Sequence, residues 1–163
     1  MVEMARKSPF YAQGLCFSCT RCSACCRYES GYVFLSEKDT SHLGAALNMG
    51  YGEFTEAFCR WIPWFPEGSG ENRAERLSLK EKSNFDCIFW ISDEGCSVYE
   101  TRPLQCRAFP FWASALDSEK SWKRTAADCP GIGRGSHHSS DSIEKWLAQR
   151  QNEPIIERIS KHV

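Results

Sequence analysis

The segment around which this chain is organised reads Cys16-Phe17-Ser18-Cys19-Thr20-Arg21-Cys22-Ser23-Ala24-Cys25-Cys26. It holds five of the ten cysteines of the 163-residue chain, spaced three apart and then adjacent. Neither a helix nor a strand needs that spacing. A soft metal does, because several thiolates must reach one point from a short, tightly wound backbone. The segment therefore predicts a metal centre with cysteine ligands.

Size and charge limit the class of protein. With 163 residues, 42% of them hydrophobic, the chain is expected to form one small domain with an apolar core. The formal net charge is −1, so no positive excess points to nucleic acid or to an anionic membrane. No apolar run approaches the ~18 residues of a membrane helix, and the first residues lack the apolar stretch of a secretory signal. We expect a cytoplasmic protein that binds neither nucleic acid nor membrane.

The expected compartment decides how the cysteines are interpreted. Ten cysteines in a secreted chain could form five disulfides, but glutathione and thioredoxin keep cytosolic thiols reduced. The adjacent Cys25 and Cys26 could bond to each other only with backbone strain. Metal binding by thiolates is therefore favoured over disulfides.

The hydrophobic pattern predicts an α+β fold, a small single domain of short strands and a few helices gathered around a cysteine-ligated metal site. Residues 1–15 are expected to be an N-terminal lead-in, and residues 16–163 the metal-binding domain, with its motif core at 17–130 and a C-terminal helical segment at 139–161. Strands are predicted at 31–35, from 76, at 87–91, 96–99 and 121–126. Helices are predicted at about 39–49, 53–60, from Pro103, from 141 or 142 and from Pro154, and irregular loops at 61–70 and 133–140.

Four later cysteines lie beside turns or Gly/Pro elements, where metal ligands usually sit: Cys87, Cys96, Cys106 and Cys129. Cys87 and Cys96 flank a predicted hairpin, across which their side chains can meet. Cys59 lies between aromatic residues and is expected to be a small buried hydrophobe. The His137–His138 pair falls in a Gly/Ser-rich stretch and is expected in solvent.

The type of metal is limited by the ligands. All-sulfur ligation favours zinc or an iron–sulfur cluster over magnesium, calcium or manganese. Zinc ribbons use two well-separated C-x2-C pairs, whereas this chain has C-x2-C at one end only. The run Cys16, Cys19, Cys22 and Cys26 has ferredoxin-like spacing, but Arg27 stands where that motif has proline. The spacing leaves iron and zinc both open.

Charge gives a second criterion. A tetrathiolate zinc site and an oxidised [4Fe–4S] site both carry a formal charge near −2, and burying it requires cations or N–H donors nearby. Arg27 follows the first cysteine cluster, while Arg102 and Arg107 flank Cys106. We expect Arg102 and Arg107 to stabilise the thiolates. The alternative is that these arginines are ordinary surface residues.

The loop at 61–70 contains three large aromatic residues, Trp61, Trp64 and Phe65. They could cover the metal or contact a protein partner. Because large aromatic side chains are mostly buried, packing onto the core is the favoured interpretation.

The motifs together resemble a known family. They are Phe17-x-Cys19-x2-Cys22-x2-Cys25-Cys26, then Cys87, then Gly95-Cys96-Ser97-Val98-Tyr99-x2-Arg102-Pro103-x2-Cys106-Arg107-x2-Pro110, and finally Cys129. This arrangement resembles the YkgJ-type cysteine-cluster family, also described as a zinc- or iron-chelating CxxCxxCC domain. The resemblance covers about residues 17–130 and leaves Cys16 outside, so the ferredoxin-like spacing no longer supports iron.

The resemblance and the residues lead to one set of expected site residues. The expected metal ligands are Cys19, Cys22, Cys25, Cys26, Cys87, Cys96, Cys106 and Cys129, serving one site or two. Residues expected to line the cofactor are Arg27, Tyr99, Arg102 and Arg107.

Three functions remain open. The first is an iron–sulfur protein, most simply of the [4Fe–4S] type, with an electron-transfer, redox-sensing or oxidoreductase role. The alternative is a structural zinc module that binds a protein partner without catalysis. The third is an enzyme with Tyr99, Arg102 and Arg107 in its pocket. No Ser/His/Asp arrangement, carboxylate pair or phosphate loop identifies a reaction or a catalytic residue.

Overall fold

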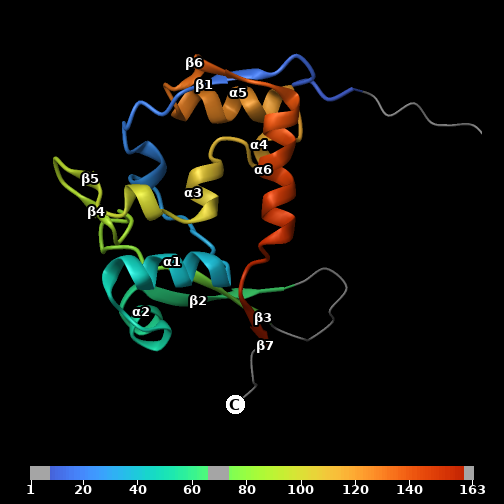
Figure 1. The fold of residues 1–163 in the computed structure, drawn as a ribbon. Coiled ribbons are helices and arrows are strands. Elements are labelled where there is room, and N and C mark those ends of the chain that lie inside the picture. The colour runs from blue at the N-terminus through green and yellow to red at the C-terminus, as the bar shows by residue number, and fades with distance from the viewer. Residues whose placement is uncertain (1–7, 66–73, 160–163) are drawn as a thin grey trace, which may run out of the picture. The chain divides into compact units, whose positions relative to one another are not determined.

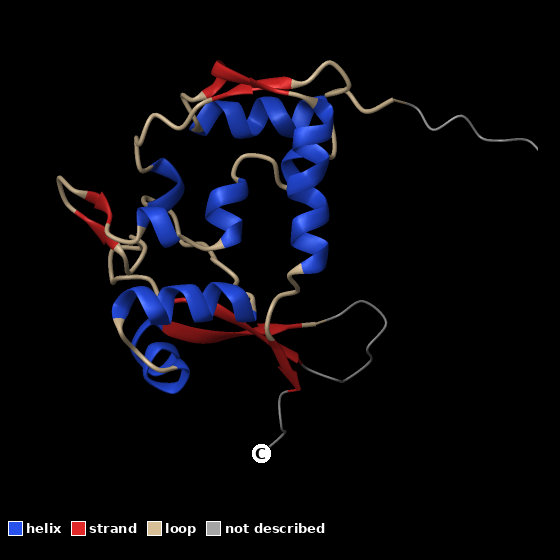
Figure 2. Cartoon of the chain, viewed as in Figure 1, coloured by secondary structure: helices blue, strands red, loops and turns tan. Residues whose placement is uncertain are grey.

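The structure, a computed structural model, describes residues 8–65 and 74–159. Short helices are mixed with short antiparallel strands, so the predicted α+β class is confirmed (Figures 1 and 2). The chain divides into two compact units. Unit 1 comprises Met1–Cys22 and Pro110–Gln149, and unit 2 comprises Ser23–Phe109 and Arg150–Val163. Among the described residues, no helix has the length and apolar character needed to cross a membrane.

Unit 1 is built on a two-stranded ribbon and helices. Strand β1 (Leu15–Phe17) pairs antiparallel with β6 (Ile132–His138), and the register shifts between Cys16 and Phe17. Helices α4 (Ala113–Leu116), α5 (Glu119–Asp128) and most of α6 (Ser140–Asn152) complete the unit. In Figure 1 the ribbon runs across α5. The core is formed by Tyr11, Phe111, Ala115, Leu116, Trp122 and Ile143.

Two predictions for unit 1 are wrong. Residues 121–126, predicted as a strand, lie in α5, whose first turn is capped because Ser118 Oγ accepts the Ser121 N–H at 3.1 Å. Its buried Trp122 stacks on Phe111 with ring centroids 6.0 Å apart, so tertiary packing decides the element. Residues 133–140, predicted as a loop, lie mostly in β6, which β1 stabilises from more than a hundred positions away.

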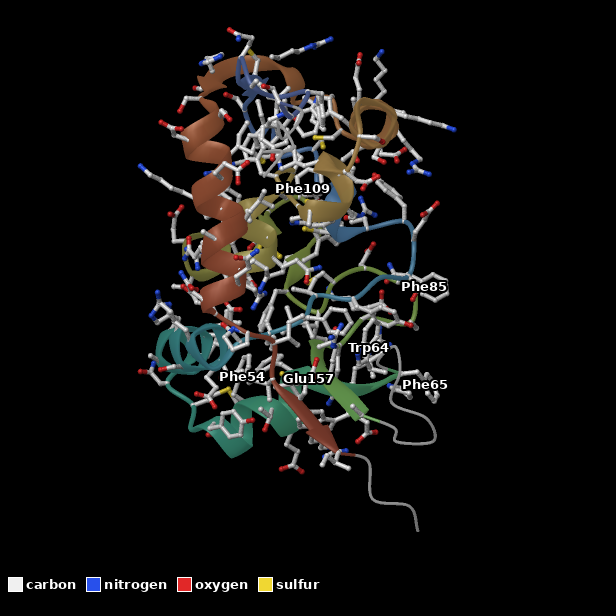
Figure 3. The ribbon with its side chains drawn as sticks, turned by 90° about the vertical axis from the view of Figure 1, so that its right-hand side faces the viewer. Phe54, Trp64, Phe65, Phe85, Phe109 and Glu157 are labelled. Atoms are coloured by element: carbon white, nitrogen blue, oxygen red, sulfur yellow. The ribbon has the colours of Figure 1, made fainter. Side chains whose placement is uncertain are left out.

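Unit 2 contains a three-stranded antiparallel sheet in the order β2 (Cys59–Trp64), β3 (Ala74–Leu79) and β7 (Glu157–Ile159). Helices α1 (Glu37–Leu47) and α2 (Tyr51–Phe58) lie against it (Figure 1). The buried core is formed by Leu35, Leu43, Phe54, Cys59, Leu77, Leu79, Phe89 and Val98. Figure 3 shows Phe54 at this core.

Helices α1 and α2 confirm the sequence prediction, and each starts two residues earlier than expected. Ser36 caps α1 through a reciprocal box: Asp39 N–H donates to Ser36 Oγ at 3.1 Å, and Ser36 N–H donates to the Asp39 carboxylate at 3.0 Å. The loop prediction for 61–70 is wrong as far as Trp64, because β2 continues through Pro63. Proline is tolerated there because β2 is an edge strand. Residues 66–70 lie outside the described part.

Three further elements differ from prediction. Trp61 packs on the core, but Trp64 is 38% exposed and Phe65 60% exposed, which corrects the expected burial (Figure 3). Residues 157–159 form β7 where a helical turn was predicted, because they pair antiparallel with β3. The strand predicted at 31–35 is reduced to an isolated bridge between Phe34 and Ser78.

The elements that carry the cysteines of unit 2 are short. They are η1 (Ala24–Cys26), β4 (Trp90–Ile91), β5 (Gly95–Cys96), η2 (Tyr99–Thr101) and α3 (Leu104–Ala108). The predicted hairpin is confirmed, with Trp90 opposite Cys96, but its strands are shorter than the predicted 87–91 and 96–99, and Tyr99 lies in η2. The helix predicted to begin at Pro103 is confirmed as α3.

Candidate metal centre

Two segments of unit 2 that are distant in sequence are joined next to their cysteines. The Cys87 N–H donates to the Cys26 carbonyl oxygen at 2.8 Å. One residue away on each segment, Arg27 Nε lies 3.2 Å from the carboxylate of buried Asp86. The guanidinium of Arg27 also stacks 3.7 Å from the Trp90 ring. Protein contacts alone therefore hold the Cys25–Cys26 segment against the Cys87 segment.

Four thiols of unit 2 form a mutually interacting group, named here the four-thiol set: Cys25, Cys87, Cys96 and Cys106. In each of the six possible pairs, the charge of one thiol raises the pKa of the other. Cys26 interacts with Cys25, Cys87 and Cys106, and its Sγ lies 3.8 Å from that of Cys25. Fold topology thus gathers thiols from η1, the 80–90 segment, β5 and α3.

Burial and mutual repulsion govern the acidity of these thiols. Burial raises the pKa of Cys87, Cys96 and Cys106, and the neighbouring thiols raise that of Cys106 further. The hydrogen bond with Cys26 instead lowers the pKa of Cys25 to about 7, while the pKa of Cys26 is raised. Several thiolates can coexist here only if a cation relieves their repulsion, which is what metal binding does.

Backbone donors face two of the thiols. Burial raises the pKa of Cys87 and of Cys96. In each case a hydrogen bond from the backbone N–H two residues further on lowers it in part; the donor is Phe89 for Cys87 and Val98 for Cys96. Hydrogen bonds of this kind compensate thiolate charge in metal centres. No sequence motif predicted these donors, although the position two residues after a turn cysteine is a signal that could identify them.

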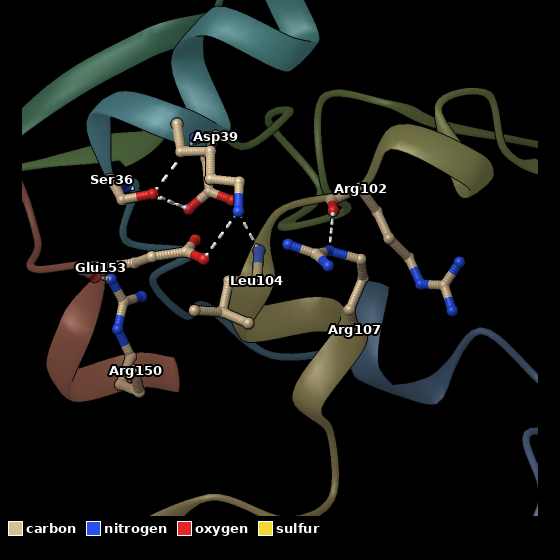
Figure 4. A network of polar contacts seen from close by, with 8 residues as sticks. Ser36, Asp39, Arg102, Leu104, Arg107, Arg150 and Glu153 are labelled. Carbon is tan, nitrogen blue, oxygen red and sulfur yellow. Dashed lines mark hydrogen bonds and ion pairs between the residues drawn. The ribbon is translucent and has the colours of Figure 1, made fainter. Parts of the chain in front are cut away.

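Arg102 supplies positive charge. Its positive charge lowers the pKa of Cys25, Cys96 and Cys106, whereas burial raises the pKa of all three. Its guanidinium stacks 3.7 Å from the Tyr99 ring centroid and donates to the Tyr99 carbonyl oxygen. Arg107 Nε in turn donates to the Arg102 carbonyl oxygen at 3.1 Å (Figure 4). Tyr99 and Arg107 therefore position Arg102.

Two further residues were not anticipated. The charge of Lys82 lowers the pKa of Cys87, and no motif pointed to it. Glu81 accepts from Gly31 N–H at 2.6 Å, Ser30 Oγ at 3.0 Å and Arg60 Nη2 at 2.5 Å. Glu81 thus fixes the chain just after η1 to the segment between β3 and Cys87.

The other cysteines have different surroundings. Cys19 and Cys22 are exposed and Cys129 is buried, all three in unit 1. Cys59 is buried in the core of unit 2, as predicted, and burial raises its pKa to about 12. It begins β2 and does not lie on a helix.

The histidine pair was expected in solvent; His137 is exposed and His138 half-buried, and both rings are hydrogen-bonded to the backbone of unit 1. His137 Nε2 donates to the Gln13 carbonyl oxygen at 2.9 Å, and His138 Nε2 to that of Phe17 at 3.0 Å. Within residues 8–65 and 74–159, no group of three or more His, Cys, Asp or Glu side chains stands close enough together to hold a metal ion as placed. The donor chemistry of the four-thiol set nevertheless fits a thiophilic metal, since it combines thiols, N–H donors and a guanidinium.

Comparison with known proteins places this arrangement in a family. Residues 18–130 match the CxxCxxCC family, described as "Putative zinc- or iron-chelating domain". The chain belongs to this family. The resemblance stated from the motifs is therefore confirmed, and the family's description fits an iron–sulfur cluster or zinc as the cofactor of this CxxCxxCC domain.

A curated relative adds no activity. The chain is 28% identical over 106 residues to "Uncharacterized protein MJ0661" of Methanocaldococcus jannaschii. The alignment covers 64% of this chain and 50% of that protein, so the chain spans about half the length of this relative. No solved structure matches the chain.

Proposed function

We propose that the four-thiol set holds an iron–sulfur cluster of the [4Fe–4S] type and that the protein transfers or senses electrons. The observation that carries this proposal is the hydrogen bond from the Cys87 N–H to the Cys26 carbonyl oxygen at 2.8 Å, which joins the two cysteine segments within one unit. The charge interactions among the four thiols agree with it. Four thiolates are the number that such a cluster requires. When bound, the cluster supplies one-electron redox chemistry.

The charges around the set support the proposal. A bound cluster with four thiolates carries about −2 in its oxidised form. The N–H groups of Phe89 and Val98 and the guanidinium of Arg102 face these sulfurs. Hydrogen bonds and cations at the sulfurs stabilise the more negative, reduced state and raise the reduction potential. Arg102 is the residue we assign to this tuning.

Exposure supports a redox partner. Cys25 is exposed, while Cys106 is half-buried. One thiol of the set is therefore within reach of an electron donor or acceptor in solution, and an oxidoreductase role with a protein partner is part of the proposal. We propose the reducing cytoplasm as the compartment, where thiols are kept available as metal ligands.

A structural zinc module is the second candidate. Four thiolates also complete a tetrahedral zinc site, and the exposed rings of Trp64 and Phe65 favour a binding role (Figure 3). Exposed aromatic side chains are enriched at protein interfaces. In this alternative the metal stabilises unit 2 and the aromatic residues contact a partner.

Anaerobic purification followed by metal analysis decides between them. Iron, acid-labile sulfide and zinc are measured on one sample, with absorption spectra before and after dithionite. The proposal predicts about four iron and four sulfide per chain and a visible absorption that bleaches on reduction. A colourless protein with zinc and no iron would remove the redox function and leave the structural module.

A further inference from the structure

The three-stranded sheet of unit 2 has one face in the core. On that face Trp61 of β2 lies opposite Leu77 of β3, and both pack into the core. Because side chains alternate between the two faces along a strand, the neighbouring positions belong to the opposite face. We name it the outer sheet face; its residues in β2, β3 and β7 are Arg60, Ile62, Trp64, Ala74, Arg76 and Ile159.

Aromatic rings and guanidinium groups alternate across this face. The guanidinium carbon of Arg76 lies 3.7 Å from the centroid of the Trp64 ring and 5.9 Å from that of Phe34, which an isolated bridge joins to β3. The rings of Phe34 and Tyr32 are 5.6 Å apart, and Arg60 lies 5.6 Å from the Tyr32 ring. The contacts form one continuous row from Trp64 to Arg60.

Large apolar side chains remain exposed on the outer sheet face. Trp64 is 38% exposed although Arg76 stacks on it, and Ile159 is 81% exposed (Figure 3). These two residues belong to the two edge strands, and both are opposite the small Ala74 of the central strand. Strands two places apart are separated by about 10 Å. Exposed apolar side chains gathered on one face indicate an interaction surface.

The charges of this face are already paired within unit 2. Arg76 Nε lies 2.6 Å from the Glu157 carboxylate, and Arg60 Nη2 lies 2.5 Å from that of Glu81. A phosphate backbone is bound by cations that it can neutralise, and these two arginines are neutralised by carboxylates. The described residues of the outer sheet face therefore complement an uncharged, apolar ligand better than a nucleic acid or a strongly basic segment.

The backbone of β2 limits how a ligand can dock. An added strand would pair with the edge of the sheet through N–H groups, but β2 is an edge strand that contains Pro63, which has no N–H. A polyproline II helix docks differently, by packing its rings on aromatic side chains. It repeats every three residues, or about 9 Å. That repeat is close to the separation of about 10 Å between the strands of Trp64 and Ile159.

We propose that the outer sheet face binds a proline-rich segment of a partner protein in the polyproline II conformation. Trp64 supplies the ring on which one proline packs, and Ile159 contacts the proline one turn further along. The inference rests on the partner-binding role proposed above for the exposed aromatic residues and names the chemistry of that partner. It is independent of the metal that the four-thiol set binds.

Fluorescence anisotropy of labelled probes with the full-length protein tests the proposal. The probes are a ten-residue proline peptide, a Gly-Ser peptide of the same length and a ten-nucleotide strand of thymidine. The proline peptide should bind at least tenfold more tightly than either of the others. Metal content and circular dichroism are measured on the same samples.

Single variants locate the site. Trp64→Ala should weaken binding of the proline peptide at least tenfold, because it removes the ring, and should keep the metal. Tyr51→Ala is the matched control, since Tyr51 is 55% exposed at the start of α2 and lies outside the outer sheet face. Its affinity should equal that of the unmodified protein. If Trp64→Ala does not fold, Ile159→Ser takes its place and should also weaken binding.

Equal affinity for the proline and Gly-Ser peptides, or unchanged affinity in the Trp64 or Ile159 variant, would overturn the proposal. Tighter binding of the thymidine strand would overturn it in favour of a nucleic-acid surface. A protein that holds its metal but binds no proline peptide would refute the docking proposal alone. A protein that binds the peptide but holds no metal would refute only the metal-binding function.

Discussion

Asp39 connects helix α1 to the helix that carries Cys106. Its buried carboxylate accepts the Ser36 N–H at 3.0 Å, the Ser36 hydroxyl at 2.9 Å and the Leu104 N–H at 2.7 Å (Figure 4). Leu104 is the first residue of α3, where N–H groups lack partners within the helix. One side chain therefore completes the cap of α1 and the start of α3.

We predict that Asp39→Ala destabilises unit 2 severely. Loss of the capping interaction costs about 1 kcal/mol. The Leu104 N–H is left buried without its acceptor, which costs about 1–3 kcal/mol more. The free energy of unfolding should therefore fall by about 2–4 kcal/mol, and Ser36→Ala, which removes only the capping hydroxyl, should cost about 1 kcal/mol.

Urea denaturation followed by circular dichroism measures these differences, with metal content determined on the same samples. The exposed Asp117 provides the control, since Asp117→Ala should change stability by no more than about 0.5 kcal/mol. An Asp39→Ala variant no less stable than Ser36→Ala would refute the reasoning, because the contact to Leu104 would then contribute nothing.

Three further predictions concern single side chains. Burial tends to raise the pKa of Glu81, but hydrogen bonds from Gly31, Arg60 and Ser30 outweigh it and lower the pKa. The stability that the ionised carboxylate adds should therefore be lost as pH falls below the ordinary value of 4.5. Urea denaturation at a series of pH values should show a smaller loss of stability in acid for Glu81→Gln. Burial and the Glu144 carboxylate raise the pKa of Tyr11 to about 12, so its contribution should be lost as pH rises from 10 through 12, and Tyr11→Phe should remove that alkaline dependence. Cys59→Ala should cost about 1–2 kcal/mol through the cavity it leaves, with metal content unchanged; metal loss would overturn its assignment to the core.

Local signals predicted the elements that need no distant partner. Leu43 and Leu47 on one face, with a polar cap before them, were enough to predict α1. The turn residues between Cys87 and Cys96 predicted the hairpin. In both cases the deciding contacts lie within a few residues of one another, so the sequence pattern carries them.

Elements stabilised by distant contacts could not be predicted in this way. Strand β6 contains Gly133, Gly135 and two histidines, a composition typical of a loop, and it exists because β1 pairs with it. Strand β7 depends in the same way on β3. Residues 121–126 were predicted as a strand, but the burial of Trp122 against Phe111 fixes them in a helix.

The candidate site shows the same limit. The cysteine spacing and the family resemblance identified the thiols and Arg102, but spacing could not divide eight thiols between units. That division depends on contacts such as the Cys87 N–H to the Cys26 carbonyl oxygen, which join segments separated by some sixty residues. It depends equally on the short helix that carries Cys106, held in place by Asp39.

The most direct test of the account is metal retained per chain in four single variants of the four-thiol set, Cys25→Ser, Cys87→Ser, Cys96→Ser and Cys106→Ser, measured beside Cys59→Ser. The account predicts that each of the four loses the same metal and that Cys59→Ser keeps it, because Cys59 lies in the apolar core. Retention of full metal by any two of the four, or equal loss in Cys59→Ser, would contradict the claim that these thiols form one metal centre.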